Sequence, residues 1–453
     1  MTNDRNKILG ETIKRLLRRD AISHLKKIVN KSHAADLSVI FRSLPIENQR
    51  KLFDLIEDIE QKSVLISELE EYTFLEFIEH LSIDECVEIF NYMPADDVAD
   101  LIGKLPKERA SSILEKMNTE DSEEVEDLLR YEDDTAGGIM VPDFIALREI
   151  VTAKEAIESL QKEYHDVEMP FYLYVVDEFN RLLGVVSLRQ LVVVKPDTPL
   201  KKFMATDIFS VRTDMDQEEV AKLVARYDIL AVPVVDDQNR LVGIVTVDDV
   251  IDIFRREATE DILKMAGVGE DFVETQSIIR STRIRLPWLF ASCLGGILAS
   301  LVISHFEGGL IKFAYLAAFI PVITGMGGNV GAQSSTIVVR GLATGRLDVR
   351  DIWTVVSKQL AIGLILGVIY GGLLGGVARF KYDHEMSASL LALAVGLSVF
   401  CSMSIAALMG SLVPMVFRKI QIDPAVASGP FISTSIDVIS VFFYLSIATT
   451  LLV

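Results

Sequence analysis

Five apolar segments, each long enough to cross a bilayer, lie in the last 168 residues of this 453-residue chain. They span roughly residues 286–306, 310–339, 353–378, 388–416 and 425–452. About 20 consecutive apolar residues carry an α-helix across the hydrocarbon core. The sequence therefore predicts a C-terminal membrane domain of five helices, and it excludes a purely soluble protein.

Charge divides the chain at the same point. Residues 1–285 carry 58 acidic and 36 basic side chains, whereas the apolar remainder carries 7 and 9. Because nucleic-acid binding needs a basic face, no nucleic-acid partner is expected. Three cysteines do not suggest a disulfide framework, and six scattered histidines do not suggest a zinc site.

Residues 20–130 have the pattern of short, repeated helices. The segments MPAD at 93–96, LPKE at 105–108 and MNTE at 117–120 recur every 12 residues. Each places Pro or Asn-Thr at a helix start, followed by an acid in the first turn. Short helices stacked in this way form a superhelix. We predict an acidic, all-α superhelical domain over residues 1–136, and interpret it as an interaction domain.

A second repeat follows. Residues 175–187 (VVDEFNRLLGVVS) align with residues 234–246 (VVDDQNRLVGIVT) at an offset of 59, and helical patterns at 153–163 and 217–227 precede them. This twofold β-α-β-β-α unit resembles a tandem pair of α/β CBS domains, which we assign to 137–200 and 201–247. CBS pairs usually sense a nucleotide or an ion and pass the result to a neighbouring domain.

A nucleotide pocket is expected in one copy at most. In CBS units that hold a ribose, a Ser or Thr is followed three residues later by Asp. The second copy has Thr246 and Asp249, but the first has Ser187 and Gln190. The alternative is that Thr246 and Asp249 only cap the helix that follows. ATP is therefore left open as a modulator of the CBS pair.

The basic residues beside the apolar segments predict the topology. Three precede the first span, four follow the second and two follow the fourth: Arg280, Arg283, Arg285, Arg340, Arg346, Arg350, Lys358, Arg418 and Lys419. The opposite loops hold only Lys312, Arg379 and Lys381. The excess of basic residues on one side predicts a multi-pass plasma (inner) membrane protein, with a cytoplasmic N-terminal half and the C-terminus outside.

Two features of these segments are unusual for helices that face lipid. Residues 321–335 (PVITGMGGNVGAQSS) hold four glycines together with Asn329 and Gln333. Asp437 lies 13 residues beyond Pro424, which is about 20 Å along a continuous helix. The plain alternatives are helix packing through small residues and a protonated, hydrogen-bonded Asp. An intramembrane carboxylate without a basic partner nevertheless indicates a cation or proton site.

The order of these parts resembles the MgtE family of magnesium channels. The shared motifs are TAGGIM at 135–140, GGNVGAQ at 327–333, DPA at 423–425, and Asp437. The resemblance implies an acidic connecting ("plug") helix and linker over 248–283 and a pore domain over 284–453. It also implies a homodimer with one ion pore at the subunit interface, lined by the second and fifth spans.

The resemblance further implies particular ion ligands. In the pore they are Asp437, Asn329 and the backbone carbonyl of Ser433. The implied regulatory Mg²⁺ ligands are acids of the soluble half, the plug helix and the membrane edge: Asp97, Asp216, Glu218, Asp228, Asp249, Asp252, Glu257, Glu260, Asp261 and Asp423. Bridging cations would hold these acidic parts together and the pore shut, because the parts otherwise repel one another.

The expected function is thus passive import of Mg²⁺ through a channel gated by cytosolic Mg²⁺, and not an enzymatic activity. No G-x-x-x-x-G-K-[ST] loop for ATP hydrolysis is present. Two alternatives stay open. One is a transporter coupled to protons or selective for another divalent cation, and the other is a non-conducting membrane sensor of Mg²⁺.

Overall fold

The computed structural model describes residues 2–163, 171–268, 278–384 and 387–452. The chain forms two compact units, Met1–Arg255 and Arg256–Val453. The boundary falls inside helix α14 (Val247–Met265), so the end of this helix belongs to the second unit.

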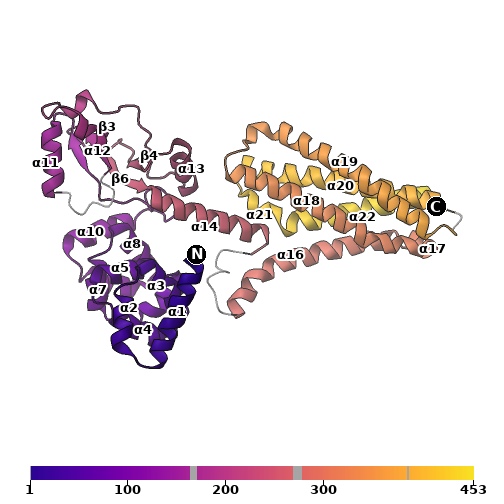
Figure 1. Cartoon of the computed structure of the whole chain (residues 1–453). Helices are drawn as coiled ribbons and strands as arrows, with labels where there is room; N and C mark the ends of the chain where they lie inside the picture. Colours follow the sequence, from indigo (N-terminus) through magenta and orange to yellow (C-terminus); the bar gives the residue numbers. More distant parts are fainter. Residues whose placement is uncertain (1, 164–170, 269–277, 385–386, 453) are drawn as a thin grey trace. The chain divides into compact units, whose positions relative to one another are not determined.

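Short helices make up the first part of unit 1 (Figure 1). Their bounds are α1 (Thr2–Arg18), α2 (Ile22–Val29), α3 (Ala34–Phe41), α4 (Ile46–Asp54), α5 (Ile59–Ser67), α6 (Glu71–Ile78), α7 (Ile83–Phe90), α8 (Ala95–Gly103), α9 (Lys107–Leu114) and α10 (Thr119–Leu128). From α2 to α10 the helices start every 12 or 13 residues. The predicted repeat is therefore confirmed, and it extends over nine helices instead of three.

Buried and partly buried polar side chains join successive layers of this stack. Gln49 donates to the carbonyl oxygens of Phe41 and Leu44 at 3.0 and 3.1 Å, at the end of α3. Arg109 donates to the carbonyls of Ile78 and Leu81, both at 2.6 Å, at the end of α6. The last carbonyls of a helix have no partner within it, so these side chains satisfy groups that burial would otherwise leave unpaired.

The rest of unit 1 holds the repeated α/β unit. The first copy comprises β1 (Ala146–Arg148), α11 (Ala153–Glu163), β2 (Tyr172–Val176), β3 (Leu182–Ser187), α12 (Leu188–Val193) and the short helix η1 (Leu200–Lys202). The second comprises β4 (Val211–Arg212), α13 (Gln217–Tyr227), β5 (Ala231–Val235), β6 (Leu241–Thr246) and the start of α14. In each copy the first strand pairs parallel with the second, and the second pairs antiparallel with the third. The predicted β-α-β-β-α order is confirmed.

The two copies meet through matching hairpin turns. Asn180 and Asn239 both have a φ of 60°, the left-handed conformation that asparagine tolerates. The Leu182 N–H donates to the Asn239 carbonyl at 3.1 Å, and the Leu241 N–H donates to the Asn180 carbonyl at 2.9 Å. The offset of 59 seen in the sequence thus corresponds to a local pseudo-twofold contact.

The TAGG motif joins the helical stack to the second α/β copy by close backbone contact. The Ala136 N–H donates to the Met215 carbonyl at 2.7 Å, and the Gly137 N–H donates to the Thr213 carbonyl at 2.9 Å. A Cβ on Gly137 would lie 2.5 Å from the Tyr131 ring, and one on Gly138 would lie 2.3 Å from the Glu132 carbonyl oxygen. Glycine at both positions is therefore required by packing.

Unit 2 is helical. After the end of α14 it contains α16 (Ile278–His305), α17 (Glu307–Lys312), η2 (Ala314–Phe319), α18 (Ile320–Ala343), η3 (Val349–Asp351), α19 (Ile352–Lys381), α20 (Ala388–Lys419), α21 (Pro424–Ser428) and α22 (Pro430–Leu452). Within the described residues, five helical stretches are long and apolar enough to cross a membrane: Ile278–His305, Ala314–Ala343, Val349–Lys381, Ala388–Lys419 and Pro430–Leu452. The five-helix prediction is confirmed.

Two predicted spans differ in detail from the structure. The second span begins as the 3-10 turn η2 and becomes α-helical only at Ile320. The fifth was predicted as one helix from residue 425, but it is broken at Gly429 into α21 and α22. The break follows from Pro430, because the residue before a proline is disfavoured in the α conformation.

A ladder of glycines joins α19 to α20, which run side by side in Figure 1. Gly363, Gly367, Gly371 and Gly375 recur every four residues and are buried. A Cβ on Gly371 would lie 2.6 Å from the Gly396 carbonyl oxygen, and a Cβ on Gly375 would lie 2.7 Å from that of Ala392. Small residues at this spacing let membrane helices approach to backbone contact.

Candidate functional site

Asp437 is the eighth residue of α22 and is partly buried. Because the helix restarts at Pro430, the predicted depth of about 20 Å is wrong; Asp437 lies about 10 Å along α22. This still places the carboxylate inside a 23-residue span. Among the described residues, it is the acid that lies in the interior of a spanning helix.

The glycine-rich stretch of α18 faces Asp437. A Cβ on Gly328 would lie 3.8 Å from the Ser433 hydroxyl and 3.9 Å from Asp437 Oδ1. A Cβ on Gly331 would lie 2.1 Å from the Ile436 side chain, so α18 and α22 are in direct contact one turn further along. The structure thus brings the two polar features of the sequence together on neighbouring helices.

Buried serines support this contact from α20. The hydroxyls of Ser402 and Ser440 share a hydrogen bond of 2.7 Å. The Ser402 hydroxyl also donates to the Ile323 carbonyl oxygen at 3.3 Å. A Cβ on Gly327 would lie 2.4 Å from the Ser402 hydroxyl oxygen. The second, fourth and fifth spans therefore meet around a small polar core beside Asp437, which the sequence alone did not indicate.

One face of α18 is polar and exposed in the single chain. Gly325, Asn329, Ala332, Gln333 and Thr336 recur every three or four residues and are all exposed. Lipid tails cannot solvate the amides of Asn329 and Gln333, so such a face is expected to meet protein or water. Asn329 is thus one residue from Gly328 but points to the outside of the single chain.

Three of the predicted regulatory acids of unit 1, Asp216, Glu218 and Asp252, have local partners. Asp216 caps α13 by accepting from the N–H groups of Glu218 and Glu219 at 2.9 and 3.4 Å. Glu218 pairs with Lys222 at 2.7 Å. Asp252 pairs with Arg255 at 3.3 Å. Asp228 ends α13 in the left-handed conformation and is exposed. Asp97 lies in the first turn of α8.

Asp249 is the most perturbed of these acids. Burial raises the pKa of its carboxyl to about 6; the hydrogen bond from Thr246 lowers it, while the charges of Asp248 and Asp100 raise it further. Asp100 lies on α8 of the helical stack, so a repulsive acidic cluster forms where α8 meets α14. A cation placed among these carboxylates would relieve the repulsion.

The raised pKa of Asp249 predicts a pH-dependent penalty. Ionising this carboxyl in the folded chain lowers the free energy of unfolding. The loss is complete above about pH 6 and disappears as the pH falls towards 4, where the unfolded chain also binds the proton. In chelator at pH 7, Asp249→Asn should therefore stabilise a soluble fragment of residues 1–268 by up to about 3 kcal/mol, and by much less at pH 5. Urea unfolding at both pH values measures this difference.

Asp252→Asn is the matched control for this prediction, because Asp252 lies one turn further along α14 and is exposed. We expect its effect to be small and equal at both pH values. An Asp249→Asn fragment with the wild-type pH profile would contradict the assigned shift.

The acids at the end of α14 lie in unit 2 with Asp423. Glu257, Glu260 and Asp261 share the final turns of α14. Asp423 Oδ2 accepts from the Lys264 ammonium at 2.7 Å, and Glu260 pairs with the same ammonium. Burial alone would lower the pKa of Lys264, but hydrogen bonds to the two carboxylates raise it above its ordinary value. Asp423 thus meets the end of α14 through Lys264, which lies between the two carboxylates.

The chemistry of these side chains fits a hard cation. Carboxylate, carbonyl and amide oxygens are the ligands that Mg²⁺ prefers, and Mg²⁺ usually keeps several of its waters. In the described part of the chain, no group of three or more His, Cys, Asp or Glu side chains is placed to hold a metal ion. Two carboxylates converge on the Lys264 ammonium, which shows that this position suits a cation. A complete ion site would therefore need water, backbone oxygens or a second copy of the chain.

The two α/β copies differ at the predicted ribose position. In the first, Ser187 and Gln190 form a reciprocal capping box at the start of α12, with bonds of 2.9 to 3.3 Å. In the second, the Thr246 hydroxyl donates to Asp249. The backbone N–H of Thr246 also bonds to Asp249, so the capping alternative describes the second copy as well. The difference between the copies is that the second has a partly buried carboxylate where the first has an amide.

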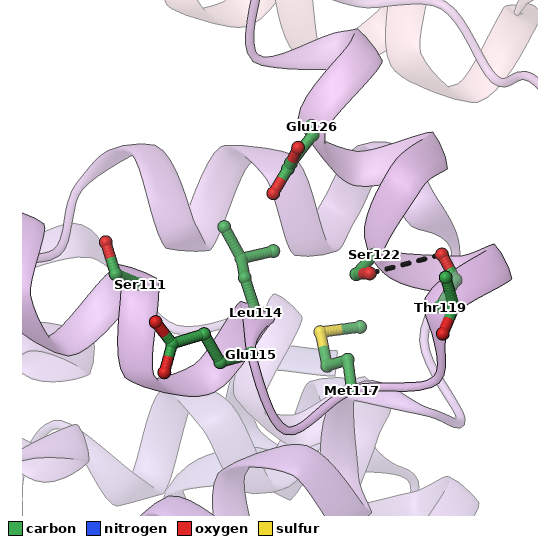
Figure 2. A pocket seen from close by; sticks show the side chains of 7 residues that line it. All are labelled: Ser111, Leu114, Glu115, Met117, Thr119, Ser122 and Glu126. Atoms are coloured by element: carbon green, nitrogen blue, oxygen red, sulfur yellow. Dashed lines mark hydrogen bonds between the residues drawn. The ribbon is translucent and has the colours of Figure 1, made fainter.

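A cavity of about 350 Å³ lies between α9 and α10 in the helical stack (Figure 2). It is lined by Ser111, Leu114, Glu115, Met117, Thr119, Ser122 and Glu126. Figure 2 shows Ser122 bonded to Thr119 within one helix, at 3.2 Å to its carbonyl oxygen. None of the predicted site residues lines this cavity.

Three residues of these sites were missed from the sequence. Lys264 follows Glu260 by four residues, a spacing typical of a helical ion pair, which was the available signal. Asp100 lies one turn after Asp97 on α8, but nothing local indicated its proximity to Asp249. Gly328 was part of a recognised motif, yet its position opposite Asp437 depends on packing.

Comparison with known proteins identifies the parts of the chain. Residues 320–447 match the MgtE family model, described as a divalent cation transporter. Residues 32–134 match the MgtE intracellular N domain, and residues 136–197 and 200–256 match CBS domains.

Relatives and solved structures agree with these matches. A Thermus thermophilus protein named magnesium transporter MgtE is 43% identical over 72% of each chain. A Bacillus subtilis protein of the same name is 33% identical over 96% of this chain and 95% of its own. The crystal structure titled as the cytosolic domain of the Mg²⁺ channel MgtE in complex with ATP has a TM-score of 0.52 and 36% identity, covering 54% of this chain and 99% of that one. With its helical stack, CBS pair and five apolar helices, this chain belongs to the MgtE family of divalent cation transporters.

Proposed function

We propose that this chain imports Mg²⁺ passively across the plasma (inner) membrane, through a channel gated by cytosolic Mg²⁺. The observation that carries the proposal is the placement of Asp437 against the glycine-rich stretch of α18. Relatives named magnesium transporter MgtE, one of them matched over nearly its whole length, support the choice of Mg²⁺ as cargo. Their family is one of transporters, not of enzymes.

The exposed polar face of α18 supports a homodimer with the pore at the subunit interface. A second copy would cover Asn329 and Gln333, and it would bring a second Asp437 towards the first. Two carboxylates close together repel each other, and a divalent cation between them removes that repulsion. In this proposal Asp437, Asn329 and the carbonyl of Ser433 contact the hydrated ion through its waters.

Gating is proposed to act through the acids outside the membrane. Asp249, Asp248 and Asp100 gather where α8 meets α14, and Glu260 and Asp423 gather at the end of α14. Asp97 lies one turn before Asp100 on α8. Mg²⁺ bound at such places would hold the acidic parts together and the pore closed, and falling Mg²⁺ would release them. In this proposal the soluble half is cytosolic and the C-terminus lies outside.

ATP is proposed as a modulator through the second CBS copy alone. The crystallised relative holds ATP in its cytosolic domain. Here Thr246 and Asp249 offer a hydroxyl and a carboxylate, whereas Gln190 closes a capping box in the first copy.

The test is Mg²⁺ uptake into proteoliposomes with chelator on both sides before Mg²⁺ is added outside. An inside-negative potential of about 100 mV favours entry of a divalent ion by about 4.6 kcal/mol. We expect uptake that rises with the potential and is absent from protein-free vesicles. Uptake that requires a proton gradient would favour a coupled transporter. Absence of uptake by folded protein would favour a membrane sensor.

A further inference from the structure

The ammonium of Lys264 lies between two carboxylates at the last turn of α14. It donates to Asp423 Oδ2 at 2.7 Å and pairs with Glu260. All three side chains are partly shielded, with exposed fractions of 29% for Lys264, 21% for Glu260 and 35% for Asp423. The lysine thus occupies the place where a regulatory cation would bridge these acids.

Asp423 is held in position for this contact. Its Oδ1 accepts from the Ala425 N–H at 2.8 Å and so caps α21, which begins at Pro424. With one oxygen fixed by the cap, the other oxygen is presented to Lys264. The ion pair therefore joins the end of α14 to the start of the fifth span, across 159 residues of sequence.

The backbones around the pair are fitted closely together. Gly267, two residues beyond the end of α14, has a φ of +72°. The Val268 N–H donates to the Leu263 carbonyl and the Gly267 N–H to the Lys264 carbonyl, both at 2.9 Å. This pattern is a Schellman motif, which fixes the end of a helix. A Cβ on Gly267 would lie 3.0 Å from the Pro430 ring.

Gly429, at the break before α22, completes the contact. A Cβ on Gly429 would lie 2.7 Å from the Met265 carbonyl oxygen. The end of α14 therefore rests directly on the break between α21 and α22, and Lys264 binds Asp423 beside it.

We propose that Lys264 is a tethered ammonium that fastens the end of α14 to the fifth span without Mg²⁺, and that regulatory Mg²⁺ competes with it for Glu260 and Asp423. This inference deepens the proposed function and rests on its assignment of Glu260 and Asp423 as regulatory ligands. One cation replaces another at the same carboxylates, and no bond is made or broken. The plug helix then has a basal attachment in the absence of Mg²⁺, and the lysine sets how much Mg²⁺ is needed to occupy the acids.

The test is hydrogen exchange of the amides of residues 262–268 in the full-length protein, measured in chelator and over a Mg²⁺ titration. In chelator, Lys264→Met should make these amides exchange about fivefold faster than in wild type. Asp423→Asn keeps the cap acceptor and should give a similar increase. The double variant should show no further increase, because both substitutions remove one contact.

The Mg²⁺ titration separates the lysine contact from the ion site. In Lys264→Met, added Mg²⁺ should restore protection of these amides. The midpoint of this change should lie at an Mg²⁺ concentration about fivefold lower than in wild type, because no ammonium competes for the carboxylates. In Asp423→Asn it should not return. Lys264→Arg keeps the charge and should behave as wild type in chelator.

Arg379→Met is the matched control, because it removes an i,i+4 ion pair with Asp383 elsewhere in unit 2 and should leave these amides unchanged. The proposed role of Lys264 would be refuted if the amides of Lys264→Met exchanged at the wild-type rate in chelator. Additive effects in the double variant would refute it as well. These arms contain no Mg²⁺ and require no transport, so failure of the proposed function would appear separately, as absent uptake by the wild type.

Discussion

Asp437→Asn is expected to reduce Mg²⁺ uptake by about 100-fold or more, with the protein still folded. The substitution keeps the size of the side chain but removes the charge that stabilises a hydrated divalent ion within a low-dielectric span. In a homodimer both charges are lost together. Uptake into proteoliposomes under an imposed potential measures the effect, and chromatography in detergent confirms folding.

Two variants serve as controls for Asp437→Asn. Ser433→Ala keeps the backbone carbonyl that is proposed to contact the ion, so uptake should stay within about twofold of wild type. Asp383 lies between α19 and α20, outside the spans, and pairs with Arg379 near the end of α19, so Asp383→Asn should have no effect. Full uptake by Asp437→Asn would remove this carboxylate from the ion path.

Gly371→Leu is expected to disrupt the membrane domain. Even a Cβ at this position would lie 2.6 Å from the Gly396 carbonyl oxygen. Gly396 belongs to α20, which also packs against α18 and α22, so its backbone cannot shift without disturbing those contacts. Overpacking against side chains costs about 1–3 kcal/mol, so a leucine against the backbone should cost at least about 3 kcal/mol. Loss of the monodisperse species in detergent, or a markedly lower melting temperature, would show this.

Gly372→Leu is the matched control, because it adds the same side chain one residue along the same helix. A Cβ on Gly372 meets no atom within 4 Å, so the added side chain would lie towards lipid. We expect near wild-type stability for this variant. Equal behaviour of the two variants would mean that α19 and α20 do not pack through the ladder.

Much of the fold could be read from the spacing of residues. The 12-residue period predicted the helical stack. The offset of 59 predicted a repeated α/β unit, which the helical patterns at 153–163 and 217–227 completed and which resembles a CBS pair. Five apolar segments predicted the five spans. These features depend on neighbours in sequence, because helix caps, strand alternation and span length are local properties. The break at Gly429 was missed, although Pro430 was a local signal for it.

The residues of the candidate sites could be predicted only in part from the sequence. Asp437 could be identified from the sequence, because an acidic residue within a long apolar segment is unusual whatever the fold. The roles of Asn329, Ser433 and the regulatory acids came from resemblance to a family, and they stay predictions. That Asn329 lies on an exposed face, whereas its neighbour Gly328 faces Ser433 and Asp437, became visible only when α18 and α22 were placed together.

The sequence by itself determined the order of the parts, the membrane domain, the CBS pair and the acid within the last span. Only the tertiary structure decided that Lys264 pairs with Asp423, that Asp100 perturbs Asp249, and that α19 packs on α20 through glycines. The physical reason is the range of the interactions. Periodicity and composition act over a few residues, whereas ion pairs and backbone contacts join segments as far as 159 residues apart, whose proximity is set by packing.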